Sequence, residues 1–419
     1  MVSFEHKINP PVYNKLFPFS QNKSQKIVAT IFFFCVYVSI LVYKNFFRES
    51  FYQDEIHFFE TSIRFGKQII PSLDLLRNYA ELNTPLPFMI GGWWTNVFGQ
   101  NIQTLRILTF LLSFFVINLF IWQSKTSTTQ MWLGLFGLWL FPNYYLCTVY
   151  FYTDIFAITA MLLGMTAYLN RRHFLAGLLF IAAISCRQYM VAFPAAIIAY
   201  EGLEIWTKTN NISSFVNKLS KKKYLVWYVL SCLSLLPWLI LWGGFAPAAE
   251  MARQHYDKIA TYKPEFVLYV SAVTTVYYVI PEAIFSRRFE YYLSYPRRNP
   301  YLFLSFLILT TIIIVLFPAQ QTKNAYFDWP YLGYVDQGLM TIGIKGIAKQ
   351  FVFGFLMLIS LMRFVRFDAD LTTWIFIINT LLLGKAQLSW DKYSLPTVLC
   401  LWFLMVFEQK DETLIKPKK

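Results

Sequence analysis

The feature that most constrains this chain is the recurrence of long apolar segments from residue 27 to residue 408. A helix that crosses a bilayer needs about 20 mostly apolar residues. Because the hydrocarbon core offers no hydrogen-bond partners to the backbone, such segments are expected to be helical. The sequence therefore predicts an all-α integral membrane protein with about 12 transmembrane helices. The predicted spans cover residues 27–47, 103–122, 130–147, 153–169, 173–186, 188–202, 224–243, 265–284, 300–317, 347–363, 370–384 and 393–408.

Composition favours a single polytopic membrane domain over residues 1–419. The chain is 57% hydrophobic and only 14% charged, whereas a soluble domain carries roughly a quarter charged residues. We expect residues 1–26 to be a cytosolic N-terminus and residues 409–419 a cytosolic tail. The first apolar stretch, Ile27–Phe47, has no small-residue cleavage site after it, so we interpret it as a retained span. The five cysteines are scattered without ligand spacing and predict neither a disulfide framework nor a zinc site.

The distribution of Lys and Arg sets the predicted orientation. With the N-terminus inside, the inner segments hold 22 of these residues and the outer segments hold 12, as the positive-inside rule requires. This count depends on reading Pro85–Phe98, which carries Trp93 and Trp94, as a helix in the membrane interface. Residues 48–102, 243–264, 318–346 and 385–392 then face outward, and the longest inner connection is 203–223. Since the basic residues lie in short loops between spans, the net charge of +14 does not indicate a nucleic-acid partner.

An acidic pair, Asp54 and Glu55, follows the first predicted span within about one turn of the membrane surface. Ile56, Phe59 and Ile63 come next at helical spacing, which predicts interfacial helices in the outer loop 48–102. A carboxylate held in the interface is partly desolvated and becomes a stronger base. An aspartate at the start of a helix can equally serve as its N-cap. The two roles are compatible.

Other polar residues are expected at the same membrane face. Asp154 lies at the start of the predicted span 153–169, and acidic residues at such positions are often functional, although a helix cap is the simpler alternative. Arg187 and Gln188 lie between two short apolar segments. This arginine can bind a phosphate, pair with Asp54 or Asp154, or extend toward the interface.

Two later outer loops carry further cations. Residues 242–247, Trp-Gly-Gly-Phe-Ala-Pro, lead to Arg253 and His255, and the last outer loop contains Lys385 and Lys392. Glycine-rich backbone and nearby cations together suit a phosphate group. The chain has only four histidines and none are paired at ligand spacing, so no metal site is predicted, although a divalent metal is not ruled out.

These residues resemble those of a known family. An acidic pair after the first span, an interfacial helix with a proline motif at residues 84–87 and an arginine-bearing helix at residues 104–108 look like the C-type (GT-C) glycosyltransferase fold. Within it, residues 52–57 (Tyr-Gln-Asp-Glu-Ile-His), 152–154 and 186–188 are similar to motifs of the dolichyl-phosphate-glucose α-1,2-glucosyltransferases. The similarity covers about the first 200 residues in order. Two family motifs differ here: its consecutive prolines are replaced by Pro85-Leu-Pro87, and its later Gly-Asp-Lys/Arg-Ser-x-His motif is missing. The sugar and the linkage therefore stay open.

The resemblance implies an inverting glycosyltransferase that moves a hexose, glucose among the candidates, from a polyprenyl-phosphate donor to a hydroxyl of a glycan or lipid-linked acceptor at the outer or luminal face. It implies no cofactor. In such an enzyme Asp54 would be the base, and Glu55 and Asp154 would orient the acceptor. The candidate ligands of the donor phosphate would be Arg187 with Gln188, Arg253, His255, Lys385 and Lys392. We expect a bacterial cell membrane, with the endoplasmic reticulum membrane as the alternative. The rival functions are a polytopic transporter and a non-catalytic lipid-handling protein, but charges at span ends and the lack of an internal repeat favour the enzyme over the transporter.

Overall fold

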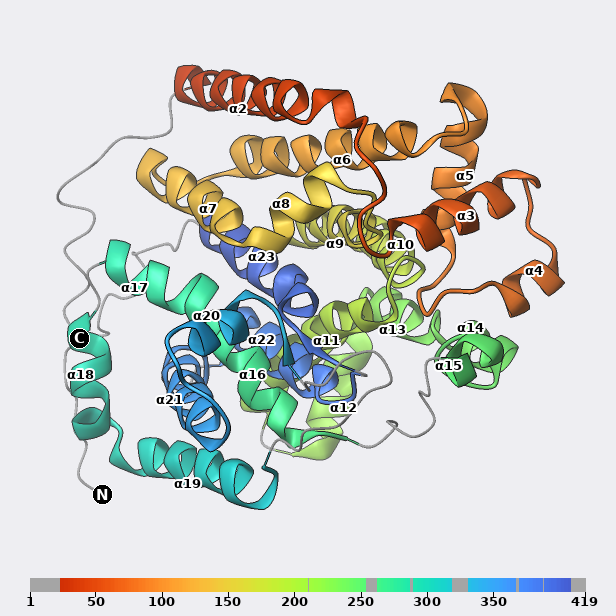
Figure 1. Ribbon diagram of the computed structural model, residues 1–419. Coiled ribbons are helices and arrows are strands. Elements are labelled where there is room, and N and C mark those ends of the chain that lie inside the picture. Colours follow the sequence, from red (N-terminus) through yellow and green to blue (C-terminus); the bar gives the residue numbers. More distant parts are fainter. Residues whose placement is uncertain are drawn as a thin grey trace.

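The computed structural model describes residues 23–209, 211–253, 262–286, 289–318, 331–366, 369–386 and 388–407, and they are mainly helical (Figure 1). In the first half the elements are α2 (Lys23–Tyr43), η1 (Asn45–Phe47), α3 (Glu55–Gly66), α4 (Leu73–Asn78), α5 (Leu86–Phe98), α6 (Ile102–Gln123), α7 (Thr128–Leu140), α8 (Pro142–Val149), α9 (Asp154–Leu169), α10 (His173–Ile184), η2 (Gln188–Val191) and α11 (Ala192–Thr207).

The second half continues the helical bundle. Its elements are α12 (Ile212–Lys221), α13 (Leu225–Leu233), α14 (Leu236–Trp242), α15 (Ala248–Arg253), α16 (Pro264–Thr274), the π-helical turn η4 (Thr275–Val279), α17 (Ile280–Phe285), α18 (Phe289–Arg298), α19 (Pro300–Leu316), β1 (Tyr331–Leu332), α20 (Tyr334–Thr341), α21 (Ile347–Phe364), α22 (Leu371–Leu383), β2 (Ser389–Trp390) and α23 (Asp391–Phe407). The two-residue strands β1 and β2 pair in parallel, which the all-α prediction did not include. This pair joins the predicted outer loops 318–346 and 385–392.

Among the described residues, five helical segments are long and apolar enough to cross a membrane, and the number rises to seven if two bent helix pairs each count as one span. The five segments are Lys23–Tyr43, Ile102–Gln123, Leu225–Trp242, Pro264–Phe285 and Ile347–Phe364. The chain is therefore a multi-pass α-helical membrane protein. Several of the remaining predicted spans form shorter apolar helices, such as His173–Ile184 and Leu371–Leu383.

A proline breaks one of the predicted spans. The expected span 130–147 is split into α7 and α8, and α8 begins at Pro142. Because proline has no N–H and its ring clashes with the preceding turn, it suits the first position of a helix and is unfavourable in the interior, although Pro396 does lie inside α23. Helices α8 and α9 then meet at 110°, and α18 and α19 meet at 99° with Pro300 opening α19.

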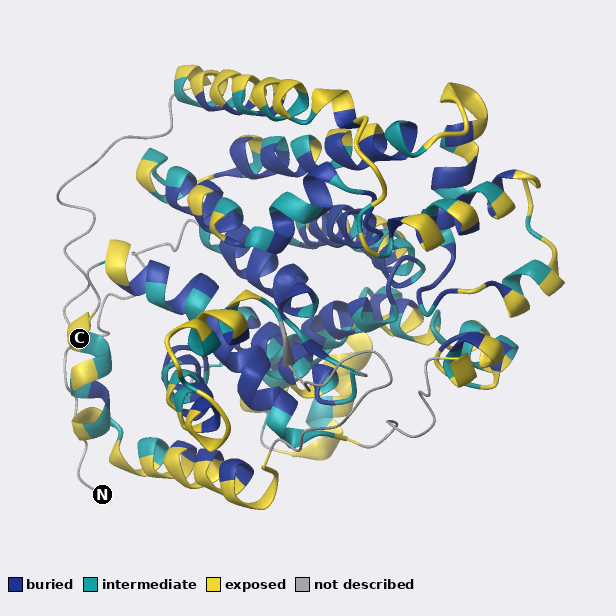
Figure 2. Ribbon diagram, viewed as in Figure 1, coloured by how far each residue is buried: buried dark blue, intermediate teal, exposed yellow. Residues whose placement is uncertain are grey.

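Burial follows the pattern of a protein whose solvent is lipid. Helices α9 and α23 lie at the centre of the bundle and are buried over most of their length (Figure 2). By contrast, α2 is strongly apolar but has only 17% of its spanning window buried, and Val28 and Phe34 are exposed. Exposed apolar side chains on such a long helix are what a lipid-facing surface needs.

Contacts between helix ends define two polar ends of the bundle. At one end the Lys26 ammonium donates to the Ser124 carbonyl at 2.8 Å, and the Lys125 amide donates to the Val406 carbonyl at 3.0 Å. At the other end Lys44 donates to the Tyr150 hydroxyl at 3.3 Å. Helix α6 runs between the two ends, and its 22 residues span about 33 Å. These contacts group the start of α2 with the end of α6 and of α23, and group the end of α2 with the turn before α9.

The predicted outer loop 48–102 folds into short helices that lie together on the right of Figure 1. Helix α3 has 12 residues, α4 has 6 and α5 has 13, so each is too short to cross a bilayer. Helices α3 and α5 pack closely because two glycines face each other: a Cβ on Gly92 would lie 2.5 Å from the Gly66 nitrogen. This contact fixes α3, and with it the acidic pair at its start.

Candidate functional site

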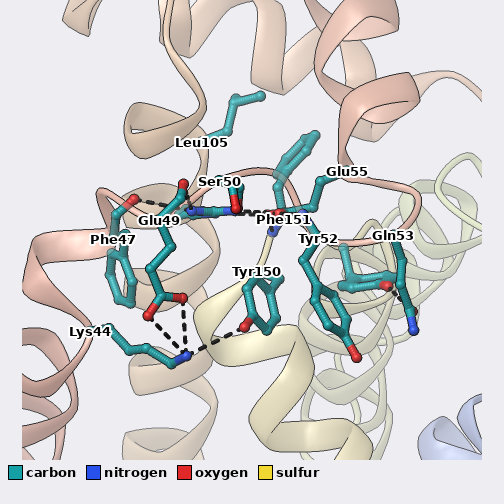
Figure 3. Close-up of polar contacts among 12 residues, drawn as sticks. Lys44, Phe47, Glu49, Ser50, Tyr52, Gln53, Glu55, Leu105, Tyr150 and Phe151 are labelled. Atoms are coloured by element: carbon teal, nitrogen blue, oxygen red, sulfur yellow. Dashed lines mark hydrogen bonds and ion pairs between the residues drawn. The ribbon is translucent and has the colours of Figure 1, made fainter.

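Glu55, the second member of the acidic pair, is fully buried, and both of its carboxylate oxygens accept hydrogen bonds from the protein (Figure 3). It accepts hydrogen bonds from the Tyr52 amide at 2.8 Å and the Phe151 amide at 2.7 Å. The Arg106 guanidinium donates to it from Nε at 2.9 Å and also from Nη2. Such a bidentate pair is specific in geometry. Glu55 therefore joins the start of α3 to α6 and to the turn before α9, and we assign it a positioning role in place of the predicted contact with an acceptor.

The same arginine holds a strained turn between α2 and α3. Asn45, Phe46 and Phe47 have φ of 45°, 52° and 61°, a left-handed conformation that non-glycine residues avoid. Arg106 donates to the carbonyls of Phe47 at 3.1 Å, Glu49 at 2.9 Å and Ser50 at 2.8 Å. Strain of this kind persists where the surrounding structure fixes it, and it is concentrated at functional sites.

Asp54 occupies the N-cap position of α3 but its side chain makes no capping hydrogen bond. Within the part of the chain that the structure describes, no hydrogen bond or ion pair engages its carboxylate, which is partly exposed. The residue before it, Gln53, has a φ of 46°, and its side chain accepts a hydrogen bond from the Tyr152 hydroxyl at 3.0 Å. Of the two roles weighed for Asp54, the cap is not made. The carboxylate is left available for a ligand.

Asp154 and Arg187 form a buried ion pair. The arginine Nη2 lies 2.6 Å from Asp154 Oδ2, and Nη1 donates to the side-chain oxygen of Asn83. Tyr189 donates its hydroxyl to Asp154 Oδ1 at 2.9 Å. Of the alternatives left open for Arg187, the structure shows pairing with Asp154. Its buried Nε alone has no hydrogen-bond partner.

Lys392 enters the same cluster from the first turn of α23. Its ammonium is 4.0 Å from Asp154 Oδ2 and lies over the rings of Tyr152 at 4.5 Å and Trp390 at 4.0 Å. The side chain is buried, so its charge is shielded from water. Because its contact with Asp154 is longer than that of Arg187, the Lys392 ammonium is bound less tightly by the protein than the Arg187 guanidinium is.

The other predicted phosphate ligands have separate outcomes. Gln188 donates to the carbonyls of Leu82 at 2.6 Å and Phe245 at 3.0 Å, and so ties the loop after α14 to the segment before α5. Arg253 forms a bidentate pair with Glu250 at 2.7 and 2.6 Å. Lys385 lies partly exposed in the turn after α22. His255 lies outside the described residues.

The sequence analysis missed Glu81. Its carboxyl is only 7% exposed, and its Oε1 has no hydrogen-bond partner. Asp54, Glu250, Arg187 and Arg253 all act on it electrostatically. Burial, reinforced by repulsion from Glu250 and Asp54, raises the pKa of Glu81 to about 8. No sequence pattern marks this residue, and only its burial in the folded chain sets it apart.

In the described part of the chain no cluster of three or more His, Cys, Asp or Glu side chains is arranged to hold a metal ion. The site is an array of carboxylates and cations at the end of the bundle that the sequence analysis predicts to face outward. No model of a known protein family, no curated protein and no solved structure matches this chain.

Proposed function

We propose that the protein is an inverting glycosyltransferase of the GT-C type, with its predicted spans in the membrane and its active site around Asp54. The observation that carries the proposal is the contrast within the acidic pair. Glu55 is saturated by Arg106 and two amides, whereas the Asp54 carboxylate is left without a hydrogen bond or ion pair in the described structure. An unpaired carboxylate that is rigidly positioned suits a general base.

The proposed reaction needs one base and several cations. The acceptor hydroxyl attacks the anomeric carbon while its proton passes to Asp54. The bond between that carbon and the phosphate oxygen breaks, and the electron pair leaves with the polyprenyl phosphate. The attack comes from the face opposite the leaving group, so the configuration inverts. The leaving phosphate is already an anion, and fixed positive charge stabilises it.

Lys392 is the cation that best fits the leaving phosphate. It is buried beside Asp154 without a close ion pair, and it lies at the start of α23, the end of that helix predicted to face outward. Arg187 already has Asp154 and Asn83 as partners, so it supports the site mainly by holding Asp154, with its buried Nε as the group left for a ligand. The exposed apolar faces of the outer helices provide a lipid environment for the polyprenyl tail.

The experiment is transfer of radiolabel by the purified protein from a panel of polyprenyl-phosphate hexoses to lipid-linked and glycan acceptors. Asp54→Asn removes the base and keeps the size of the side chain. General base catalysis contributes about 10²–10⁴-fold in rate, so turnover should fall by that factor with little change in the amount of folded protein.

Asp74→Asn is the matched control. Asp74 is exposed on α4 in the same outer loop, and its carboxylate only accepts a hydrogen bond from Asn78. This variant should retain full activity. Wild-type turnover in Asp54→Asn would refute the proposed reaction. So would passage of the unchanged labelled donor across the membrane of sealed vesicles with no transferred product.

A further inference from the structure

Glu81 is a buried carboxyl group that the proposed reaction does not yet use. It lies in the segment between α4 and α5, and only 7% of its surface is exposed. Its Oε1 has no hydrogen-bond partner. A buried polar atom without a partner costs about 1–3 kcal/mol in proteins. Its retention at this position therefore calls for a ligand that completes it.

The backbone on both sides of Glu81 is fixed to the elements of the site. Tyr79 donates its hydroxyl to the Asn83 carbonyl, and Gln188 donates to the Leu82 carbonyl at 2.6 Å. Thr84 donates to the Ile184 carbonyl at 2.8 Å. These contacts hold the backbone next to Glu81 against η2 and the end of α10. Its carboxyl stays at the site while its hydrogen-bonding capacity remains unused.

The charges around Glu81 favour its neutral form. It faces Asp54 at the start of α3, Glu250 and Arg253 on α15, and Arg187 before η2. Burial and the two acidic neighbours outweigh the two arginines and raise the pKa of Glu81 to about 8. Arg187 and Arg253 are also in direct contact with other carboxylates, Asp154 and Glu250. The raised pKa therefore favours the neutral form of Glu81 at pH 7, and a neutral carboxyl can donate a hydrogen bond.

We propose that Glu81 hydrogen-bonds a hydroxyl group of the acceptor next to the hydroxyl that Asp54 deprotonates. The inference rests on the proposed glycosyl transfer. A neutral acid offers one donor and one acceptor, which matches a hydroxyl group, whereas the ionised Asp54 only accepts. The two carboxyls, which interact electrostatically, would thus have different protonation states and different tasks. The acceptor is a polyol or sugar with neighbouring hydroxyls.

The test compares three variants of Glu81 in the transfer assay as a function of pH. Glu81→Gln keeps a neutral donor, so it should retain activity. Wild-type activity should fall as pH rises through about 8, where Glu81 ionises, and the glutamine variant should lose this alkaline decline. Glu81→Ala should raise the KM for the acceptor by about 2–12-fold, the worth of one neutral hydrogen bond, with the KM for the donor unchanged. Glu81→Asp should restore part of this affinity. Glu60→Gln, an exposed position on α3, is the matched control and should leave both KM values and the pH profile unchanged.

A second measurement is independent of activity. Infrared spectra of the wild type at pH 7 should contain the C=O band of a protonated carboxylic acid, and Glu81→Gln should lose it. Loss of turnover by more than about 10²-fold in Glu81→Gln, or an unchanged alkaline decline, would mean that a carboxylate or another group is required and would overturn the proposal. Absence of the acid band would also overturn it while leaving the proposed reaction intact. Absence of transfer with every donor would refute the proposed function itself.

Discussion

Glu55→Gln should destabilise the fold strongly, although it changes only one oxygen to an NH₂ group. The four hydrogen bonds that reach Glu55 all come from N–H donors, namely the amides of Tyr52 and Phe151 and two nitrogens of Arg106. A glutamine NH₂ would face at least one of these donors. It would also leave the Arg106 guanidinium, 1% exposed, without its counter-charge.

The magnitude follows from this burial. Removing one partner of a buried ion pair costs about 3–5 kcal/mol. At about 2 °C per kcal/mol, the low end for larger domains, the melting temperature should fall by about 6–10 °C. Thermal unfolding of the detergent-solubilised protein, followed by tryptophan fluorescence, measures the shift. Asp54→Asn should shift the melting temperature by less than about 1 °C, because surface changes away from such features are within about 0.5 kcal/mol.

Glu49→Gln is the matched control for Glu55→Gln. Glu49 lies in the same turn and pairs with Lys44 at 3.1 Å, but its side chain is 43% exposed. An exposed ion pair is worth about 0–1 kcal/mol, so this variant should melt within about 2 °C of the wild type. If Glu55→Gln melts as Glu49→Gln does, the buried pair does not hold the turn. The positioning role assigned to Glu55 would then be wrong.

Three further outcomes are expected. A cysteine at Leu73 should react with an impermeant thiol reagent in intact cells, and one at Ser213 should be protected until the cells are permeabilised; both positions are exposed, and the reverse pattern would contradict the orientation. Lys392→Gln should raise the KM for the donor by about 10–150-fold, because a charge-assisted hydrogen bond is worth about 1.5–3 kcal/mol, and the KM for the acceptor should change less. An unchanged donor KM would exclude Lys392 as a phosphate ligand. Gly92→Ala should lower stability by about 1–3 kcal/mol in thermal unfolding, because its Cβ would lie 2.4 Å from the Ser62 carbonyl oxygen. In the control Gly202→Ala the added Cβ has nothing within 4 Å, so this variant should be neutral or slightly stabilising.

The helix positions could be predicted well because they depend on local composition. Residues 103–122 were predicted as a span and α6 covers Ile102–Gln123; residues 347–363 were predicted and α21 covers Ile347–Phe364. The count of twelve spans depends on how broken helices are treated, which apolar length alone does not decide. The longest predicted inner connection, 203–223, was given no secondary structure, and it contains the amphipathic helix α12, whose apolar residues Ile212 and Val216 are exposed. Its apolar residues are too few to stand out from the spans around them.

The site was harder to predict because its contacts join distant residues. Adjacent acids are indistinguishable in sequence, yet Glu55 is selected by Arg106, 51 residues later, and Asp54 is not. The sequence left several partners open for Arg187, and only the fold brings it against Asp154. Glu81 belongs to no periodic pattern, so burial was the only property that could reveal it, and burial of an irregular segment is decided by tertiary packing.

The region around Asp54 has an energetic cost that its local contacts do not remove. Each left-handed residue costs about 1–2 kcal/mol, and four such residues, at positions 45–47 and 53, precede Asp54. Arg106 and Glu55 are buried together to hold this backbone, although a buried ion pair is often no more stable than an apolar replacement. A chain selected for stability alone would relax the turn and cap α3 with Asp54. Instead, strain and buried charge are both retained, and their joint result is a rigid helix start with an unengaged carboxylate. Relieving the strain should therefore separate stability from activity: Asn45→Gly should raise the melting temperature in thermal unfolding, since glycine tolerates its φ of 45°, and should lower turnover by loosening Asp54. A variant that gains both stability and activity would show that the strained turn does not position the base.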